Sequence, residues 1–407
     1  MPDDSLPLTV DVDDGRLWTL RAGEVGPPGV VGSGVYVPVE GGRVAAVDAG
    51  GGRILWCSDP LGGPVPAEAV GADGVVVIPL REAGPPGGFT ALDRASGSVR
   101  WTLRDRDPRT AVLGAGAVVL LWSHSAKAGS VLAAVDARSG ERLWERAFRH
   151  LWGVLVRGDR VIVGADAPRA LDTRTGDGLW RGAYGQLLDP EGPVDQAVFH
   201  VWEQGELSVR ASDTGEELSR VRFPEGALRR VHGSPELVDG GGILFEDVLR
   251  ARIRLFARDG SGRAAGPLLD VSLSPWRRVL LQRTAVGADG WVYAVTRSRP
   301  PGRRVLGHPV LHAVRAGARG RPPRQTVRGP DGRSLMPWDL AAGAEYLFAG
   351  DGREIAAVRD GRVVWRGGDG EVGAPVPLGA DRVLFLASGG GRHRLYCADA
   401  ATGRTAS

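Results

Sequence analysis

The sequence contains no asparagine and only one lysine, Lys127, although lysine and arginine together make up 51 of its 407 residues. It also contains only two cysteines, Cys57 and Cys397, which lie far apart in the chain. Two such cysteines form neither a disulfide framework nor a CxxC metal pair, so they point to a reducing compartment. No apolar run reaches the roughly 18 residues of a membrane span. The first residues also lack a signal peptide and a lipid-accepting cysteine, and we therefore expect a cytoplasmic protein.

Glycine and proline are abundant, and they predict a chain with frequent turns. The sequence has 62 glycines and 28 prolines without a collagen period, while 43% of its residues are hydrophobic. Helical periodicity over 11 or more residues is not evident anywhere. Short stretches rich in β-branched residues recur instead, for example "GVYVPV" (34–39) and "RVLFLA" (382–387). This pattern of short strands between turns is typical of an all-β protein with a sizeable core.

One segment recurs along the chain and sets its organisation. The clearest copies are "AAVDAGGGRILW" (45–56), "TALDRASGSVRW" (90–101), "AAVDARSGERLW" (133–144) and "RALDTRTGDGLW" (169–180). Their tryptophans are separated by 45, 43 and 36 residues, a period typical of propeller blades. Weaker copies continue to the end of the chain, so the repeat covers nearly all of it.

The residue types within the repeat predict one four-stranded antiparallel sheet, or blade, per copy. Asp and Ser/Thr near the turn satisfy backbone donors, Gly permits a positive φ, and Trp on the next strand packs against the neighbouring blade. One blade cannot bury both of its faces, so blades must stack. The residues assigned to these structural roles are Trp18, Asp48, Trp56, Asp93, Trp101, Asp136, Gly140, Trp144, Asp172, Gly176, Trp180 and Trp365.

These copies resemble the PQQ-like β-propeller repeat family, whose repeat reads A-x-D-x-x-T-G-x-x-x-W. The resemblance implies a single propeller domain over residues 1–407, and its non-enzymatic branch is the nearer likeness. We favour eight blades, the usual number in this family. Direct counting of the repeats gives nine, and we expect one divergent unit in 200–340 to be a false count. The strand at about 8–20 is expected to close the ring with the C-terminal unit at 379–407.

The quinoprotein enzymes of this family imply a quinone over a calcium ion held by Glu, Asn and Asp, and often a disulfide between adjacent cysteines. This chain has no asparagine and no adjacent cysteines, so no such ligand set can be assigned. His308 and His312 would lie about 13 Å apart on one strand, too far apart to share a zinc ion. Hydrolase and P-loop motifs are missing as well. We therefore assign no catalytic residue, cofactor or metal, and disfavour an enzyme.

A partner site is expected where the repeat is broken. Enlarged hairpins at 80–89, 122–130 and 297–309 should emerge on one face of the scaffold. Residues 250–328 contain 17 arginines and three acids, a balance of +14 that would attract an acidic partner. A solvated basic sector in an arginine-biased chain is the simpler alternative. The residues assigned to partner binding are Arg277, Arg278, Arg297, Arg299, Arg303 and Arg304.

The function we favour is a monomeric, non-catalytic scaffold that binds a protein or peptide partner, acidic in character, through one loop face and this arginine-rich sector. Nucleic acid is disfavoured because the sector has few aromatic residues for base stacking. The alternative is an enzyme or a small-ligand-binding protein that uses the central funnel, for instance in a biosynthetic pathway. Because this step rests on the fold, the residues themselves leave the partner open.

Overall fold

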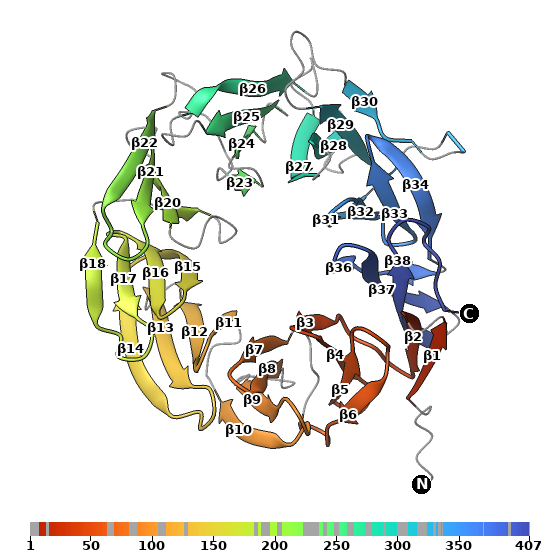
Figure 1. The fold of residues 1–407 in the computed structure, drawn as a ribbon, viewed down its shortest axis with the longest axis horizontal. Helices are drawn as coiled ribbons and strands as arrows, with labels where there is room; N and C mark the ends of the chain where they lie inside the picture. The colour runs from red at the N-terminus through yellow and green to blue at the C-terminus, as the bar shows by residue number, and fades with distance from the viewer. Residues whose placement is uncertain are drawn as a thin grey trace. The chain divides into compact units, whose positions relative to one another are not determined.

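The computed structural model describes residues 8–13, 16–62, 69–80, 88–104, 111–125, 129–182, 186–188, 196–201, 206–222, 236–238, 242–247, 252–258, 264–272, 279–287, 290–298, 308–315, 324–328, 331–332, 335, 337–368, 370–389 and 392–406. Every regular element in these residues is a β-strand (Figure 1). None of them forms a helix with the length and apolar character that a membrane span requires.

The strands follow one another in groups along the chain. Residues 9–104 form β1 (Thr9–Asp13), β2 (Leu17–Ala22), β3 (Gly29–Val31), β4 (Gly34–Val39), β5 (Arg43–Asp48), β6 (Ile54–Cys57), β7 (Val70–Ala72), β8 (Val75–Leu80), β9 (Gly88–Asp93) and β10 (Val99–Arg104). Residues 111–222 form β11 (Ala111–Ala115), β12 (Val118–Ser125), β13 (Gly129–Asp136), β14 (Arg142–Phe148), β15 (Leu151–Arg157), β16 (Arg160–Ala165), β17 (Arg169–Asp172), β18 (Gly178–Arg181), β19 (Gln186–Leu188), β20 (Gln196–Val201), β21 (Glu206–Ala211) and β22 (Glu217–Arg222).

Residues 236–326 form β23 (Glu236–Val238), β24 (Gly242–Asp247), β25 (Arg252–Arg258), β26 (Ala264–Ser272), β27 (Val279–Val286), β28 (Trp291–Ser298), β29 (Pro309–Arg315) and β30 (Arg324–Thr326). The last strands are β31 (Asp339–Ala342), β32 (Leu347–Gly350), β33 (Ile355–Arg359), β34 (Arg362–Gly367), β35 (Glu371–Val372), β36 (Val376–Leu378), β37 (Arg382–Gly389) and β38 (Arg392–Asp399).

The sheets confirm the predicted fold class, an all-β propeller of four-stranded antiparallel blades. Eight sheets contain four consecutive strands each, in orders such as β11-β12-β13-β14 and β15-β16-β17-β18, and one larger sheet joins the two ends of the chain. The described residues therefore form nine sheets, which equals the direct count of units and is one more than the eight that we favoured. The reason is that weak repeats in 200–340 still pair as hairpins: β19-β20-β21-β22, β23-β24-β25-β26 and β27-β28-β29-β30 are separate sheets.

A β-bulge lies at the same place in many sheets, immediately before the tryptophan position. In the pair β13–β14, Ala134 faces Trp144 and Val135 faces Arg142, so Leu143 is the extra residue. Such a bulge changes the direction of the side chains that follow it. The equivalent extra residues are Leu55, Arg100, Leu179, Leu218 and Val364. Leu55, Leu179, Leu218 and Val364 are exposed. The residue that follows each of them is directed inward wherever it is a tryptophan.

The two ends of the chain share one sheet, as predicted. Its strands run in the order β1-β2-β38-β37-β35, and β36 also pairs with β37. Within it Trp18 faces Cys397 and Leu20 faces Leu395 in antiparallel register. The Thr19 hydroxyl also donates to the carbonyl of Ala406, 3.2 Å away. The N-terminal strand therefore completes the sheet that the C-terminal unit begins.

Two compact units make up the chain, one with Met1–Val70, Val76–Arg106 and Arg278–Ser407, the other with Gly71–Val75 and Asp107–Arg277. In each unit the apolar core lies between neighbouring sheets. One core of the second unit joins Leu120, Leu132 and Trp144 of one sheet to Val161 and Leu171 of the next. Since both faces of an inner strand are covered, the central strands are almost wholly apolar.

Candidate functional site

The repeated aspartates hold their own turns. The Oδ1 atom of Asp93 accepts hydrogen bonds from the backbone N–H groups of Ala95 and Ser96, at 3.0 and 2.9 Å. The backbone carbonyl of Asp93 accepts a further bond from Gly97, whose φ is +75°. Arg100 binds the other carboxylate oxygen through Nε at 3.0 Å. The carboxylate therefore acts as a turn former, and the general-base role that a lone Asp suggests does not fit it.

The same arrangement recurs wherever the repeat is well preserved. Carboxylate oxygens accept backbone N–H groups two or three residues further on at Asp48, Asp136, Asp172 and Asp399. These bonds also lower the pKa of Asp136 and Asp172. The described residues contain no group of three or more His, Cys, Asp or Glu side chains placed to hold a metal ion.

We expect Asp93→Asn to destabilise the protein at pH 7 by up to about 1 kcal/mol, the range for an exposed ion pair. Bonds from Arg100, and then from Ser96, hold the pKa of the Asp93 carboxyl at about 2. The pKa of this carboxyl in the unfolded chain is near 4. The bonds to Asp93 therefore stabilise the folded state fully above that pH, and their contribution is lost as pH falls toward 2. The difference in thermal midpoint between wild type and variant, measured from pH 7 to pH 2, should therefore shrink below about pH 4. A pH-independent difference would contradict this assignment.

Five of the repeat tryptophans pack onto the turn of the following repeat. The indole N–H of Trp144 donates to the carbonyl of Thr173 at 2.9 Å, and its ring covers Gly176, whose φ is +72°. The same indole-to-carbonyl bond joins Trp18 to Ala49, Trp56 to Arg94, Trp180 to Ser212 and Trp365 to Ala400. Trp101 is equally buried, and Gly140 has a φ of +71°. These residues form the architecture of the blades.

The cysteines and histidines do not assemble into a reactive site in the part of the chain that the structure describes. Cys57 and Cys397 are both free thiols. Burial raises the pKa of the Cys397 thiol to about 11, which keeps it protonated. His312 is buried against the hydroxyl of Thr296, with its Nε2 atom 2.9 Å from Oγ1, and His308 is exposed. The spacing of four residues between the two histidines therefore follows from their places on the chain, since His308 lies just before β29 and His312 lies within it.

Of the arginines assigned to partner binding, the structure describes Arg297. Its guanidinium carbon lies 4.2 Å from the centroid of the Trp338 ring. Trp338 is 50% exposed, whereas the repeat tryptophan Trp18 is fully buried. The other five, Arg277, Arg278, Arg299, Arg303 and Arg304, lie outside the described residues, as do the centres of the three enlarged hairpins. The result is an arginine–tryptophan pair at the surface of the first unit.

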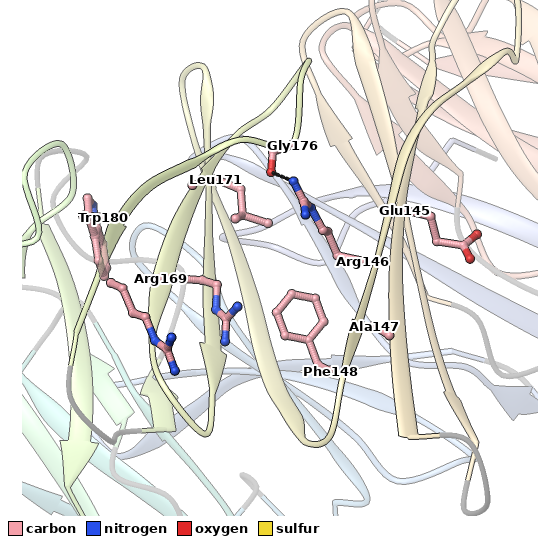
Figure 2. A pocket seen from close by; sticks show the side chains of 10 residues that line it. Glu145, Arg146, Ala147, Phe148, Arg169, Leu171, Gly176 and Trp180 are labelled. Atoms are coloured by element: carbon pink, nitrogen blue, oxygen red, sulfur yellow. Dashed lines mark hydrogen bonds between the residues drawn. The ribbon is translucent and has the colours of Figure 1, made fainter.

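A second group of arginines lines a cavity of about 630 Å³ in the second unit (Figure 2). Arg146 comes from β14, Arg169 from β17 and Arg181 from β18. The guanidinium carbon of Arg169 lies 5.2 Å from the centroid of the Phe148 ring. Burial lowers the pKa of Arg169, the neighbouring Arg181 and Arg146 lower it further, and Asp166 opposes this effect. Arginine still stays charged at neutral pH, so the cavity is cationic.

Sequence reasoning did not single out Trp338 or the three cavity arginines. Trp338 stands in "MPWDL", with Pro330 and Ser334 at the positions eight and four residues before it where the clear repeats have Asp and Gly, and this departure could have marked it. Arg146 and Arg181 follow repeat tryptophans by two and one residues, and Arg169 precedes a repeat aspartate by three. Their positions look like ordinary outward-facing repeat positions, so only the packing of two sheets brings them together.

Two sequence comparisons bear on the chain. A family model described as outer membrane protein assembly factor BamB matches residues 8–125 and 127–270. No curated protein matches the sequence. The family match covers the four clear repeats and extends into the weaker ones.

Several solved structures resemble the fold at low sequence identity. BamB from Moraxella catarrhalis is 16% identical, with a TM-score of 0.40 over 71% of this chain and 96% of that one. A europium-containing methanol dehydrogenase is 14% identical, with a TM-score of 0.48 over 93% and 85%. The quinohemoprotein alcohol dehydrogenase from Comamonas testosteroni is 13% identical, with a TM-score of 0.46 over 99% and 77%. Both an assembly factor and enzymes are represented, so these likenesses do not select a function.

Proposed function

Since the chain belongs to the outer membrane protein assembly factor BamB family of PQQ-like repeat proteins, we propose that it is a non-catalytic propeller scaffold that binds a protein or peptide partner. The observation that carries the proposal is the pair of Arg297, which is partly buried, and Trp338, which is half-exposed. Arg297 lies in the arginine-rich sector, residues 250–328, to which the sequence assigned partner binding, and Trp338 lies ten residues beyond its end. The name of the family supports an assembly role in general terms and leaves the partner open.

The physical argument starts from the exposure of Trp338. A half-exposed tryptophan leaves a large apolar face in water, and burying it against a partner is favourable. Arg297 on this ring keeps both side chains oriented, which lowers the cost of ordering them on binding. Tryptophan and arginine are also the residue types most enriched among energetically dominant interface residues. The pair therefore has the composition of an interface centre.

The chemistry of the repeats supports a scaffold over an enzyme. The repeated carboxylates are held by the backbone N–H groups of their own turns, and the tryptophans are used between sheets. The alternative of an enzyme or small-ligand protein that uses the central funnel gains no specific observation from the described residues. A cytoplasmic site of action and a monomeric state complete the proposal, and the two free thiols are consistent with the former.

Affinity capture from the native cells tests this function. We expect Trp338→Ala and Arg297→Glu each to reduce recovery of a specific partner about tenfold or more, since such central residues are worth roughly 2 kcal/mol. Arg138→Glu is the matched control, because Arg138 is an exposed arginine of another sheet that pairs with Asp73. A second variant should reverse Arg299, Arg303 and Arg304. Equal recovery by wild type and all variants, or no specific partner for any of them, would refute the proposal.

A further inference from the structure

The cavity lined by Arg146, Arg169 and Arg181 is a binding site that the scaffold role alone does not explain. It lies where β14 of one sheet faces β17 and β18 of the next (Figure 2). Its volume of about 630 Å³ falls within the range of sites that bind ligands. Phe148 and Leu171, both buried, give it an apolar wall.

The charges of this cavity are not balanced from within. None of the three arginines forms an ion pair with a carboxylate among the described residues. Arg146 donates instead to the carbonyl of Gly176 at 3.0 Å, and Arg169 to that of Ala167 at 3.3 Å. Both bonds hold the guanidinium groups in place, and a neutral carbonyl does not cancel their charge, which Asp166 offsets in part at Arg169.

The one carboxylate of the lining does not neutralise these groups. Glu145 points away from Arg169 and Phe148 in the close view (Figure 2). It is already paired with Arg142, at 2.8 Å between Oε2 and Nη1. Burial is the main reason why the pKa of Arg169 is lowered, and the positive charges of Arg181 and Arg146 lower it further. An anion in the cavity would relieve the repulsion between these charges and form charge-assisted hydrogen bonds.

The surrounding strands indicate what form the anion takes. β14 and β18 are the last strands of their sheets, so each presents an edge that is unpaired within the sheets of the described residues. An extended polypeptide fits such edges, and its alternate side chains point to the same side. Acidic side chains at alternate positions would therefore reach the arginines.

We propose that this cavity binds an acidic stretch of extended polypeptide, an inference that rests on the proposed protein-binding function and assigns the chemistry of the partner. Arg169 and Arg181 contact its carboxylates, and Phe148 and Leu171 contact the methylene groups of its acidic side chains. Arg146, held by Gly176, supplies the third positive charge. The site lies in the second unit, and the pair Arg297–Trp338 lies in the first.

Fluorescence anisotropy with the full chain tests the inference. The probe is a fluorescein-labelled peptide with glutamate at alternate positions, and the neutral reference is the same peptide with glutamine. We expect the glutamate peptide to bind at least about tenfold more tightly than the reference, and less tightly as salt rises. Arg169→Gln and Arg181→Gln should each weaken its binding about tenfold, whereas Arg138→Gln, which removes the same charge elsewhere, should not. Circular dichroism checks that all variants are folded.

Several results would overturn the inference. These are equal affinity for both peptides, equal loss in Arg138→Gln, or binding of inorganic tripolyphosphate at the arginines without binding of the peptide. The last result would make the cavity a site for small oxyanions. Failure here is distinct from failure of the scaffold proposal, which depends on Trp338. Loss of the captured partner in Trp338→Ala together with no peptide binding rejects only the acidic ligand, and peptide binding without any Trp338-dependent partner rejects the pair Arg297–Trp338 as the interface of the scaffold.

Discussion

Trp144→Ala is expected to lower the free energy of unfolding by about 3–5 kcal/mol, the range for removing a buried tryptophan from a core. The side chain is 8% exposed and packs with Leu120, Leu132 and Leu171 between two sheets. Its removal leaves a cavity that rigid strands cannot fill. It also leaves the carbonyl of Thr173 without the indole donor. The loss can be measured as the shift of the urea midpoint by circular dichroism.

Two matched variants separate the contributions to this loss. Trp144→Phe keeps an aromatic ring between the sheets and removes the indole N–H, so we expect a loss of about 1–3 kcal/mol. Trp338→Ala removes the same residue type from an exposed site and should change stability by less than about 1 kcal/mol. A loss in Trp338→Ala as large as that in Trp144→Ala would mean that burial between sheets is not what makes the repeat tryptophans important.

The repeat made the architecture predictable, because its residue types have few other uses. Aspartate four residues before glycine, with tryptophan four residues later, specifies a turn and a wedge between sheets, and four clear copies exclude coincidence. The same reasoning placed Trp18 and the C-terminal unit in one sheet, where Trp18 now faces Cys397. The number of sheets was harder to predict, since weak repeats still form hairpins when their strands alternate.

The β-bulge, the cavity and the arginine–tryptophan pair could not be predicted from the spacing of the repeat. The bulge at Leu143 breaks the alternation of an ideal strand, so period-2 reasoning places the neighbours of Trp144 on the wrong faces. The cavity depends on Arg146 and Arg169, which are 23 residues apart and meet only because two sheets pack together. Arg297 and Trp338 are 41 residues apart and also meet only through packing. Sites of this kind arise from tertiary packing, which a repeat pattern does not encode.

Gly176→Ala is the second substitution with a large expected effect, a loss of about 2–5 kcal/mol. The φ of +72° at Gly176 costs alanine about 1–2 kcal/mol. A Cβ atom there would also lie 2.7 Å from Cγ and Cδ2 of Trp144, and such overpacking costs about 1–3 kcal/mol more. Gly158→Ala is the control, because Gly158 has a φ of +59° with nothing within 4 Å of the added atom. It should lose only the backbone contribution.

A double-mutant cycle can then isolate the contact between glycine and tryptophan. If the added methyl group collides with the indole ring, Trp144→Ala removes the obstacle, and Gly176→Ala in that background should cost no more than Gly158→Ala does. The two substitutions should therefore be less than additive by about 1–3 kcal/mol in urea unfolding. Additive losses would show that the turn tolerates the methyl group and that backbone strain alone explains the glycine. The cycle thus tests directly whether the glycine of one repeat is present to admit the tryptophan of the preceding repeat.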